Sequence, residues 1–246
     1  GGAFAERTAS REGRGALKLP RIDFLYRGGR FLSKVFLPTF GTMIVEGREH
    51  MPKTGPVLIA SNHQSYTDPA VLIYAVDRPM WWMAKRSLFK NRCFGWFLRK
   101  VHAFAVEREA QDLGALARAQ ELLDQGRALL IFPEGTRFPG ALGKGHDGLA
   151  YLALRTGVSV VPLAVTGTDT IPHVLMTPFH FRKLKAVIGK PYTLPTNQRI
   201  DRALLEEMTE QVMISIAELL PPEYRGVYRE AVDENASATL GDGSSP

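Results

Sequence analysis

Short apolar runs alternate with longer amphipathic stretches along most of the chain. The runs are rich in β-branched and aliphatic side chains and end near glycine, proline or polar residues, which is typical of strands. We expect strands at residues 42–46, 57–60, 80–84, 103–106, 128–132, 159–165 and 184–188. We expect helices at residues 69–76, 87–100, 113–125, 148–156 and 201–220.

The longest of these helices, residues 201–220, has apolar side chains at steps of three and four. Such spacing gives a helix one continuous apolar face. Gly126 and Gly157 each follow a predicted helix, where glycine commonly ends one. The regular change between strand and helix predicts an α/β fold, with a mostly parallel or mixed central sheet covered by helices on both faces.

The two ends of the chain differ in composition from its middle. Residues 1–20 are small, polar and charged, so we expect a disordered arm there rather than a signal peptide, which needs an apolar core. Residues 42–229 carry the alternating elements and form the folded domain. Residues 230–246 become polar and small again, and we expect a disordered tail.

Residues 21–41 form a basic and apolar segment between the arm and the domain. At helical spacing its apolar side chains form a stripe and its arginines and Lys34 a flank, which favours a helix lying in a membrane interface. The alternative is an amphipathic helix packed on the domain, and Gly28-Gly29 weakens either helix. No apolar run approaches the roughly 18 residues of a transmembrane helix, so we expect peripheral or monotopic attachment.

The net charge of +6 and the pI of about 9.5 indicate a polyanionic partner. Nucleic acid, an anionic membrane surface and phosphorylated substrates all fit. Basic and aromatic side chains interleave between Arg78 and Arg108, which suits stacking on nucleic acid, contact with lipid headgroups, or an ordinary apolar stripe with flanking lysines. Cys93 is the sole cysteine, which excludes an intrachain disulfide and a four-cysteine metal site.

The segment Asn62 to Asp68 places a histidine directly after a predicted buried strand and a carboxylate where the next helix begins. A histidine acts as a general base when a second group fixes its tautomer. Positions five apart on a regular helix point away from each other, so contact between His63 and Asp68 requires a turn between them. The alternative is that Asp68, before Pro69, only caps the helix.

A second polar segment, Phe132 to Arg137, follows the predicted strand at 128–132. Loops at the carboxyl ends of strands bind ligands in open α/β sheets. Gly135 permits close approach of backbone N–H groups, and Arg137 suits a phosphate. Arg108 ends another predicted strand and is a candidate for the same edge. Taken alone, each arginine better fits a solvated surface position, with Arg108 paired to Glu107 or Glu109.

Several other chemistries lack their signatures. Gly143-Lys144-Gly145 is not a P-loop, because Phe138 replaces the first glycine and no serine or threonine follows the lysine. There is no G-x-S-x-G nucleophile elbow and no H-E-x-x-H motif. These absences lead us to expect no metal, and the resemblance given next also implies that no cofactor is needed.

Together these segments resemble the glycerol-phosphate/lysophosphatidic acid acyltransferase superfamily. Asn62 to Asp68 matches its N-H-x-x-x-x-D motif, Val106 to Arg108 the end of its second motif, and Phe132 to Arg137 its F-P-E-G-T-R motif. Val160 to Val165 resembles the fourth. The resemblance covers about Val45 to Tyr228. In two places the chain departs from the family pattern: His102 stands where the second motif usually opens with glycine, and Lys144 is displaced from a usual Lys-Gly or Arg-Gly step.

The resemblance implies an acyltransferase domain at residues 42–229. It would move a fatty acyl chain from acyl-CoA or acyl carrier protein to lysophosphatidic acid, giving phosphatidic acid. His63 would be the base, Asp68 its partner and Gly135 part of the oxyanion site. The substrate-binding residues expected from it are Asn62, Arg108, Glu134, Thr136, Arg137 and Lys144.

Two rivals remain at this point. The first is an acyltransferase acting on another lyso-lipid. The second is a non-catalytic basic protein that binds membranes or nucleic acid, although such a protein needs neither the His63/Asp68 pair nor the complete Phe132–Arg137 segment. The expected partners are the lysophospholipid and acyl thioester substrates, an anionic membrane surface and acyl carrier protein, without nucleic acid. The expected location is the cytoplasmic face of the cell membrane.

Overall fold

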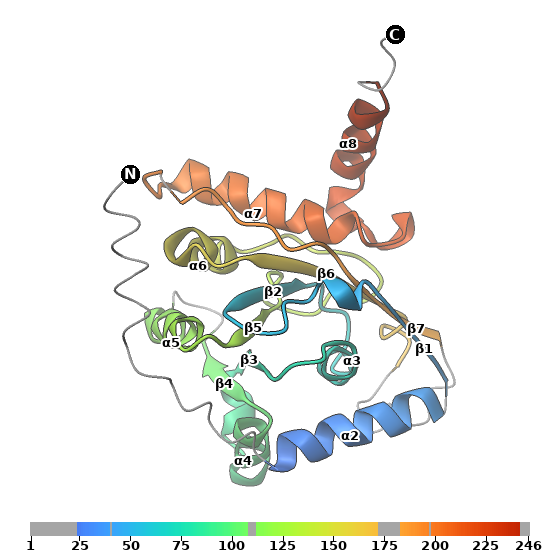
Figure 1. The fold of residues 1–246 in the computed structure, drawn as a ribbon, viewed down its shortest axis with the longest axis vertical. Helices are drawn as coiled ribbons and strands as arrows, with labels where there is room; N and C mark the ends of the chain where they lie inside the picture. The colour runs from blue at the N-terminus through green and yellow to red at the C-terminus, as the bar shows by residue number, and fades with distance from the viewer. Residues whose placement is uncertain (1–23, 40, 108–111, 172–182, 197, 242–246) are drawn as a thin grey trace.

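The structure, a computed structural model, describes residues 24–39, 41–107, 112–171, 183–196 and 198–241 (Figure 1). The predicted arm at residues 1–20 and the candidate Arg108 lie outside the described residues. A seven-stranded sheet forms the centre, in the order β1-β7-β6-β2-β5-β3-β4. Its strands are β1 (Thr42–Glu46), β2 (Val57–Ser61), β3 (Met80–Lys85), β4 (Ala103–Val106), β5 (Ala128–Ile131), β6 (Val160–Thr166) and β7 (Lys183–Ile188).

Strands β6, β2, β5, β3 and β4 run parallel to one another. Strands β1 and β7 are parallel to each other, and β7 is antiparallel to β6, so this pair runs against the other five. The sheet is therefore mixed, as the sequence pattern predicts. The carboxyl ends of the five parallel strands share one edge with the amino ends of β1 and β7.

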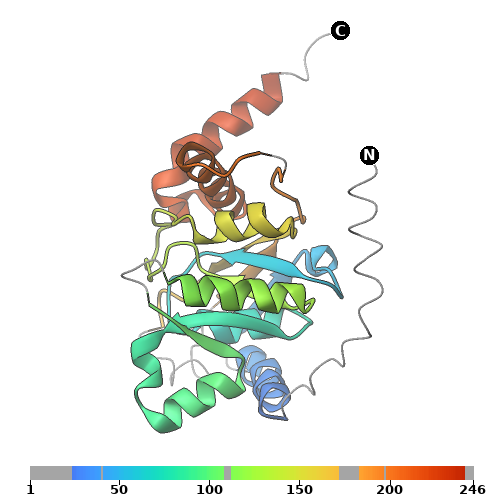
Figure 2. The same cartoon turned by 90° about the vertical axis from the view of Figure 1, so that its left-hand side faces the viewer.

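Helices cover both faces of the sheet (Figures 1 and 2). The main ones are α2 (Phe24–Thr39), α3 (Asp68–Ala75), α4 (Arg92–Lys100), α5 (Leu113–Asp124), α6 (Gly148–Thr156), α7 (Arg202–Ala217) and α8 (Arg229–Gly241). Side chains of α5, α6 and α7 share one buried cluster, and side chains of α2 and α3 share a second. The two clusters contain alternate residues of β2, Leu58 in one and Ile59 in the other, because successive strand side chains point to opposite faces. The predicted α/β class is thus confirmed.

Two predicted elements differ from the structure. The helix expected at residues 87–100 is broken into the 3₁₀ turn η2 (Arg86–Phe89) and α4, because Asn91 accepts a hydrogen bond from the Phe94 N–H (3.0 Å) and caps a new helix. The disordered tail expected from residue 230 is wrong as far as Gly241, since residues 229–241 form α8. This alanine- and glutamate-rich segment favours a helix, and it is anchored by buried Val232 and by the Arg225–Asp233 ion pair (2.9 Å).

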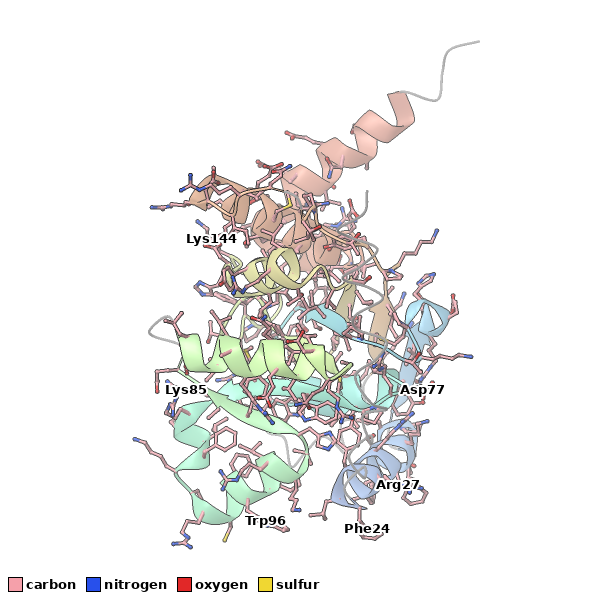
Figure 3. The ribbon with its side chains drawn as sticks, turned by 60° about the vertical axis from the view of Figure 1, so that its left-hand side comes forward. Phe24, Arg27, Asp77, Lys85, Trp96 and Lys144 are labelled. Atoms are coloured by element: carbon pink, nitrogen blue, oxygen red, sulfur yellow. The ribbon has the colours of Figure 1, made fainter. Side chains whose placement is uncertain are left out.

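The segment predicted at residues 21–41 does form a helix, α2, and one stripe of it packs on the domain. Its buried residues are Tyr26, Ser33 and Leu37. The Tyr26 hydroxyl accepts a hydrogen bond from the Met80 N–H (3.2 Å). Asp77, labelled beyond the end of α3 in Figure 3, pairs with two α2 side chains and with Arg48. None of the helices in the described part of the chain is long and apolar enough to cross a membrane.

A stack of rings joins α2 to the sheet. The ring of His102, just before β4, stacks on Tyr26 and on Trp81, with ring centroids 4.4 and 4.3 Å away. The guanidinium of Arg127 lies over the Trp81 ring, 4.8 Å from its centroid. The backbone of His102 is left-handed (φ 67°), a conformation in which glycine is the least strained residue. The left-handed backbone explains why the family usually has a glycine at this position. In this chain the histidine adds ring contacts that join α2 to the sheet.

Candidate active site

The first and third motifs meet at the carboxyl edge of the parallel strands. Asn62 and His63 follow β2, and Phe132 follows β5, which is the parallel neighbour of β2. The His63 and Phe132 rings stack with centroids 4.0 Å apart. The Phe138 N–H donates to the His63 carbonyl oxygen (2.8 Å), so the two loops are also joined through their backbones. The predicted convergence of these segments is confirmed.

His63 and Asp68 are in direct contact across the predicted turn. His63 Nδ1 lies 2.7 Å from Asp68 Oδ2, and both side chains are buried. A carboxylate accepts hydrogen bonds, so Nδ1 carries the proton and Nε2 is left with the lone pair. Nε2 has no hydrogen-bond partner among the described residues. The geometry is that of an oriented general base.

Asp68 does not cap α3. It is the first helical residue, and the helix has no side-chain cap from the preceding Thr67. Its Oδ2 instead accepts the backbone N–H groups of Gln64 (2.7 Å) and Ser65 (2.9 Å), which come before it. The capping alternative is therefore wrong, because the carboxylate points back into the turn that carries His63.

Thr168 completes the surroundings of Asp68, and sequence reasoning missed it. Its buried hydroxyl donates to Asp68 Oδ1 at 2.5 Å. Thr168 lies just past the end of β6, another strand of the same parallel set. The available signal was its place after the buried strand, since polar residues at that edge face the same site. Both carboxylate oxygens of this buried side chain are thus hydrogen-bonded.

Glu134 holds the two motifs together rather than facing a substrate. It is buried to 1 % exposure, its Oε1 accepts the His63 N–H (2.6 Å), and its Oε2 accepts the Gly143 N–H (2.8 Å). Burial is the main reason that its pKa is raised to about 8, with Asp68 adding a smaller repulsion. Both oxygens are occupied by backbone donors, which gives Glu134 a supporting place, and its expected contact with substrate stays a prediction.

Asn62 also has a structural place. It is 1 % exposed, its Nδ2 donates to the Val165 carbonyl (2.9 Å), and its Oδ1 accepts the Val165 N–H (2.7 Å). This two-way bond continues the pairing of β2 and β6 past the strand end. Asn62 therefore fixes the start of the His63 turn, and its expected role in binding substrate stays a prediction.

Gly135 has the left-handed backbone that its residue type allows (φ 64°), but its own N–H is already used. That N–H donates to the Phe132 carbonyl oxygen (3.0 Å), closing a turn. The expectation that N–H groups around Gly135 hold an oxyanion therefore stays a prediction, and the Gly135 N–H is not one of the groups left open for it. Among the described residues, the N–H groups of Thr136 and Arg137 have no hydrogen-bond partner.

The guanidinium of Arg137 lies over an aromatic ring of the first motif. Its guanidinium carbon is 3.7 Å from the centroid of the Tyr66 ring, and Tyr66 is 55 % exposed. No carboxylate of the described residues pairs with Arg137, so its N–H donors are not neutralised by an acid. Thr136 and Lys144 are exposed, and both lie in the same loop between β5 and α6 as Arg137.

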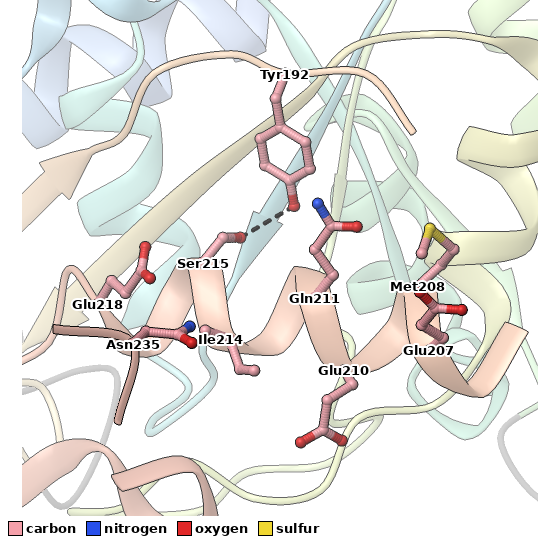
Figure 4. A pocket seen from close by; sticks show the side chains of 9 residues that line it. All are labelled: Tyr192, Glu207, Met208, Glu210, Gln211, Ile214, Ser215, Glu218 and Asn235. Atoms are coloured by element: carbon pink, nitrogen blue, oxygen red, sulfur yellow. Dashed lines mark hydrogen bonds between the residues drawn. The ribbon is translucent and has the colours of Figure 1, made fainter. Parts of the chain in front are cut away.

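One cavity of the described residues lies away from this site. It measures about 550 Å³ and lies along α7, where Figure 4 shows Tyr192 hydrogen-bonded to Ser215 (3.0 Å). Glu207, Glu210 and Glu218 also line it, and none of its lining residues belongs to the motifs. The chemistry is therefore assigned to the sheet edge on hydrogen bonding and position rather than on cavity size.

The His63–Asp68 pair can only activate a group that arrives with a substrate. No serine or cysteine side chain of the described residues is hydrogen-bonded to His63, so the site lacks a nucleophile of its own. The α/β fold with this buried pair at its sheet edge defines a class, that of α/β enzymes, and the geometry suits deprotonation of a hydroxyl that a substrate brings.

Comparison with known proteins gives the particular family. Residues 42–166 match the model of the Acyltransferase family, so the chain belongs to that family and is an acyltransferase. It is 31% identical over 186 residues to a 1-acyl-sn-glycerol-3-phosphate acyltransferase of Bacillus subtilis, covering 73% of this chain and 90% of that one. It is 33% identical over 155 residues to the chloroplastic enzyme LPAT1 of Arabidopsis thaliana, covering 61% of this chain and 43% of that one.

A solved structure has the same fold. The crystal structure of the 1-acyl-sn-glycerophosphate (LPA) acyltransferase PlsC from Thermotoga maritima superposes with a TM-score of 0.64 and 25% identity. The match covers 88% of each chain. The α/β architecture with its mixed sheet is therefore shared with an enzyme of this family.

Proposed function

We propose that the protein transfers a fatty acyl chain from an acyl thioester to the free hydroxyl of lysophosphatidic acid, producing phosphatidic acid. The observation that carries this is the oriented His63–Asp68 pair beside an arginine that has no acidic partner among the described residues. The names of the relatives support the same acceptor. Phosphatidic acid formation makes it an enzyme of phospholipid biosynthesis.

His63 acts as the base in this proposal. Its Nε2 takes the proton of the acceptor hydroxyl while that oxygen attacks the thioester carbonyl carbon. Asp68 stabilises the imidazolium that forms. When the tetrahedral intermediate collapses, the carbon–sulfur bond breaks, and His63 returns the proton to the departing thiolate. The products are the ester and a free thiol, and the histidine is regenerated.

Arg137 holds the acceptor phosphate. The Tyr66 ring beneath it restricts the guanidinium before the substrate arrives, which reduces the entropy lost on binding. A planar guanidinium forms two parallel hydrogen bonds to a phosphate. Lys144 and Arg108 are further candidates for this phosphate or for those of the donor. Anchoring the headgroup keeps the hydroxyl beside His63 and supplies proximity.

The developing oxyanion needs donors other than the Gly135 N–H. We assign this role to the backbone N–H groups of Thr136 and Arg137, which have no hydrogen-bond partner among the described residues. A donor of this kind contributes about 3–4 kcal/mol in studied enzymes. Gly135 then has an indirect role, since its left-handed conformation shapes the loop that carries them.

The donor is a thioester of CoA or of acyl carrier protein, and its activated carbonyl makes a covalent enzyme intermediate, a metal and a cofactor unnecessary. Both substrates are amphiphilic or lipid-derived. We therefore place the enzyme peripherally at the cytoplasmic face of the membrane, on an anionic lipid surface.

A panel of acceptors tests the proposal. Purified enzyme, one acyl-CoA and matched lyso-lipids are assayed by release of free thiol. We expect lysophosphatidic acid to be the best acceptor. Equal or higher kcat/KM for a lysophospholipid with a larger headgroup would assign the enzyme to another acceptor, and no thiol release with any acceptor would contradict transferase chemistry on these substrates.

Arg137→Ala extends this test to the phosphate site. We expect kcat/KM for lysophosphatidic acid to fall roughly tenfold to a hundredfold, the range for a lost charged hydrogen bond, with a much smaller loss for monoacylglycerol. Arg118→Ala is a matched control, because that arginine is exposed on α5 and pairs with Glu121. Equal losses on both acceptors would remove Arg137 from the phosphate site.

A further inference from the structure

We propose that the chain just after α7 positions the active site, and that it acts on His63 through a loop between β5 and α6. This chain consists of the 3₁₀ turns η4 (Pro222–Tyr224) and η5 (Gly226–Tyr228), and we call residues 222–228 the clamp segment. The family model matches residues 42–166 and so does not include it. The inference rests on the proposed function only in that His63 is the base.

The loop of residues 142–146, which we call the bridging loop, lies directly on the F-P-E-G-T-R segment. Its Gly143 N–H donates to Glu134 Oε2 (2.8 Å), and its His146 N–H donates to a backbone carbonyl of that segment (2.9 Å). The other oxygen of the same side chain, Glu134 Oε1, accepts the His63 N–H (2.6 Å). One buried carboxyl group therefore joins the bridging loop to the turn that carries the base.

The clamp segment holds the bridging loop from its other side. The Leu142 N–H donates to the Tyr224 carbonyl oxygen (2.9 Å), and the Val227 N–H donates to the Leu142 carbonyl oxygen (3.4 Å). The Gly145 N–H donates to the Tyr228 hydroxyl (3.1 Å). Leu142 and Tyr228 are both buried, so water competes little for these hydrogen bonds. The N–H groups of the bridging loop are thus divided between the active-site loop and the clamp segment.

Gly226 marks the closest approach of the clamp segment to the bridging loop. Its backbone is left-handed (φ 55°), and a Cβ at this position would lie 2.0 Å from the Leu142 carbonyl oxygen. A side chain at position 226 must therefore displace the bridging loop or the clamp segment. The position requires glycine both for its backbone conformation and for this contact.

These contacts connect the clamp segment to the base in steps. The Tyr228 hydroxyl holds Gly145 of the bridging loop. That loop donates to Glu134, and Glu134 accepts the His63 N–H. Tyr228 is therefore a positioning residue, which acts on His63 through the loop and does not contact a substrate.

Positioning of this kind has its own kinetic signature. A loosened bridging loop leaves His63 less well oriented, which lowers kcat. The acceptor KM should change little, because no contact with a substrate is lost. The loss should be the same factor for every acceptor, since His63 serves them all. Arg137 should behave differently, because its loss affects acceptors that carry a phosphate.

Tyr228→Phe tests the clamp segment, because it removes only the oxygen that accepts the Gly145 N–H. With each acceptor that the wild type uses, we expect kcat to fall roughly threefold to tenfold, the range for a lost neutral hydrogen bond. Tyr192→Phe is the matched control, since its hydroxyl is bonded to Ser215 (3.0 Å) in the cavity along α7 (Figure 4). A wild-type kcat in Tyr228→Phe, or an equal loss in Tyr192→Phe, would overturn the inference.

Gly226→Ala displaces the same contact by steric means. We expect kcat to fall roughly tenfold to a hundredfold, because a displacement of about 1 Å at an active site can cost that much. Gly126→Ala is its control, since Gly126 is also left-handed (φ 74°) but has nothing within 4 Å of the added Cβ. Equal kcat values in these two variants, both folded by thermal scan, would contradict the clamp. Tyr228→Phe decides the question if Gly226→Ala does not fold.

Hydrogen–deuterium exchange gives a measurement that needs no substrate. In Tyr228→Phe we expect faster exchange of the peptides that cover residue 63 and residues 133–146, with no change in α5. Unchanged exchange at residues 133–146 would overturn the inference even if kcat is lower. Absence of thiol release by the wild-type enzyme would contradict the proposed function alone, since the exchange measurement still decides whether the clamp segment holds the active-site loop.

Discussion

At the scale of single residues, the carboxylate of Asp68 organises the site. It accepts hydrogen bonds from Nδ1 of His63, from two backbone N–H groups of the same turn and from the Thr168 hydroxyl. A buried charge is tolerated only when such partners satisfy it. The contact of His63 with Asp68 could be predicted because the motif places both residues on one turn. Thr168 could not, because it is 100 positions from Asp68 and reaches it only through strand order.

Thr168→Val tests whether this hydroxyl positions Asp68. Valine keeps the shape of the side chain but leaves Asp68 Oδ1 without its donor, so the carboxylate holds His63 less well. We expect kcat to fall roughly tenfold with little change in the acceptor KM, because a hydrogen bond to a charged group contributes about 1.5–3 kcal/mol. Thr168→Ser should restore most of kcat. An unchanged kcat in the valine variant would show that Thr168 has no part in catalysis.

Glu134 predicts a specific dependence of stability on pH. Its pKa is about 8 in the folded protein against an ordinary value of 4.5, so between these values the folded state keeps a proton that the unfolded chain releases. The stability from that proton is fully present below about pH 4.5 and is lost as pH rises through about 8. Glu134→Gln cannot titrate there. The difference in Tm between wild type and this variant should therefore shrink from pH 5 to pH 8 in thermal scans.

A Tm difference that stays constant or grows with pH would mean that Glu134 is already ionised in the folded protein. The sequence could not show this environment. Glu134 lies in a loop motif that suggests a ligand contact, and only the fold reveals that the loop turns it inward onto the backbone of His63 and Gly143.

At the scale of elements, strand and helix positions followed closely from the apolar pattern, while local hydrogen bonds decided the exceptions. Asn91 divides a predicted helix, and α8 replaces a predicted tail. A capping side chain settled the first, and the burial of Val232 against the domain settled the second.

His102 shows how one element is fitted to another. Its left-handed backbone costs energy for any residue with a Cβ, while its ring lies in the stack that fixes α2. His102→Ala loses the stack and keeps the strain, whereas His102→Gly loses the stack and relieves the strain. We expect both variants to be less stable than wild type, and alanine to be less stable than glycine by about 1 kcal/mol. Urea unfolding measures this, and the reverse order would mean that the strain is absent.

At the scale of the whole molecule, strand order explains why motifs far apart in sequence form one site. Strands β6, β2 and β5 are parallel neighbours, so the residues that follow them meet at one edge. The sequence predicts that the polar segments after these strands lie at one edge of the sheet, because loops after parallel strands share an edge. It could not predict that the parallel β1–β7 pair runs antiparallel to the other five strands, because this depends on pairing across the whole sheet.

The central claim is that His63 deprotonates the acceptor hydroxyl, and the turnover of His63→Ala tests it most directly. The measurement is thiol release from acyl-CoA with lysophosphatidic acid, on purified variant with a wild-type Tm. His50→Ala is the control, since that ring contacts the Ile188 carbonyl away from the motifs. We expect the His63 variant to lose at least a factor of about 10²–10⁴ in kcat, the usual contribution of a general base, and His50→Ala to lose little. Near-normal turnover by folded His63→Ala would contradict the account.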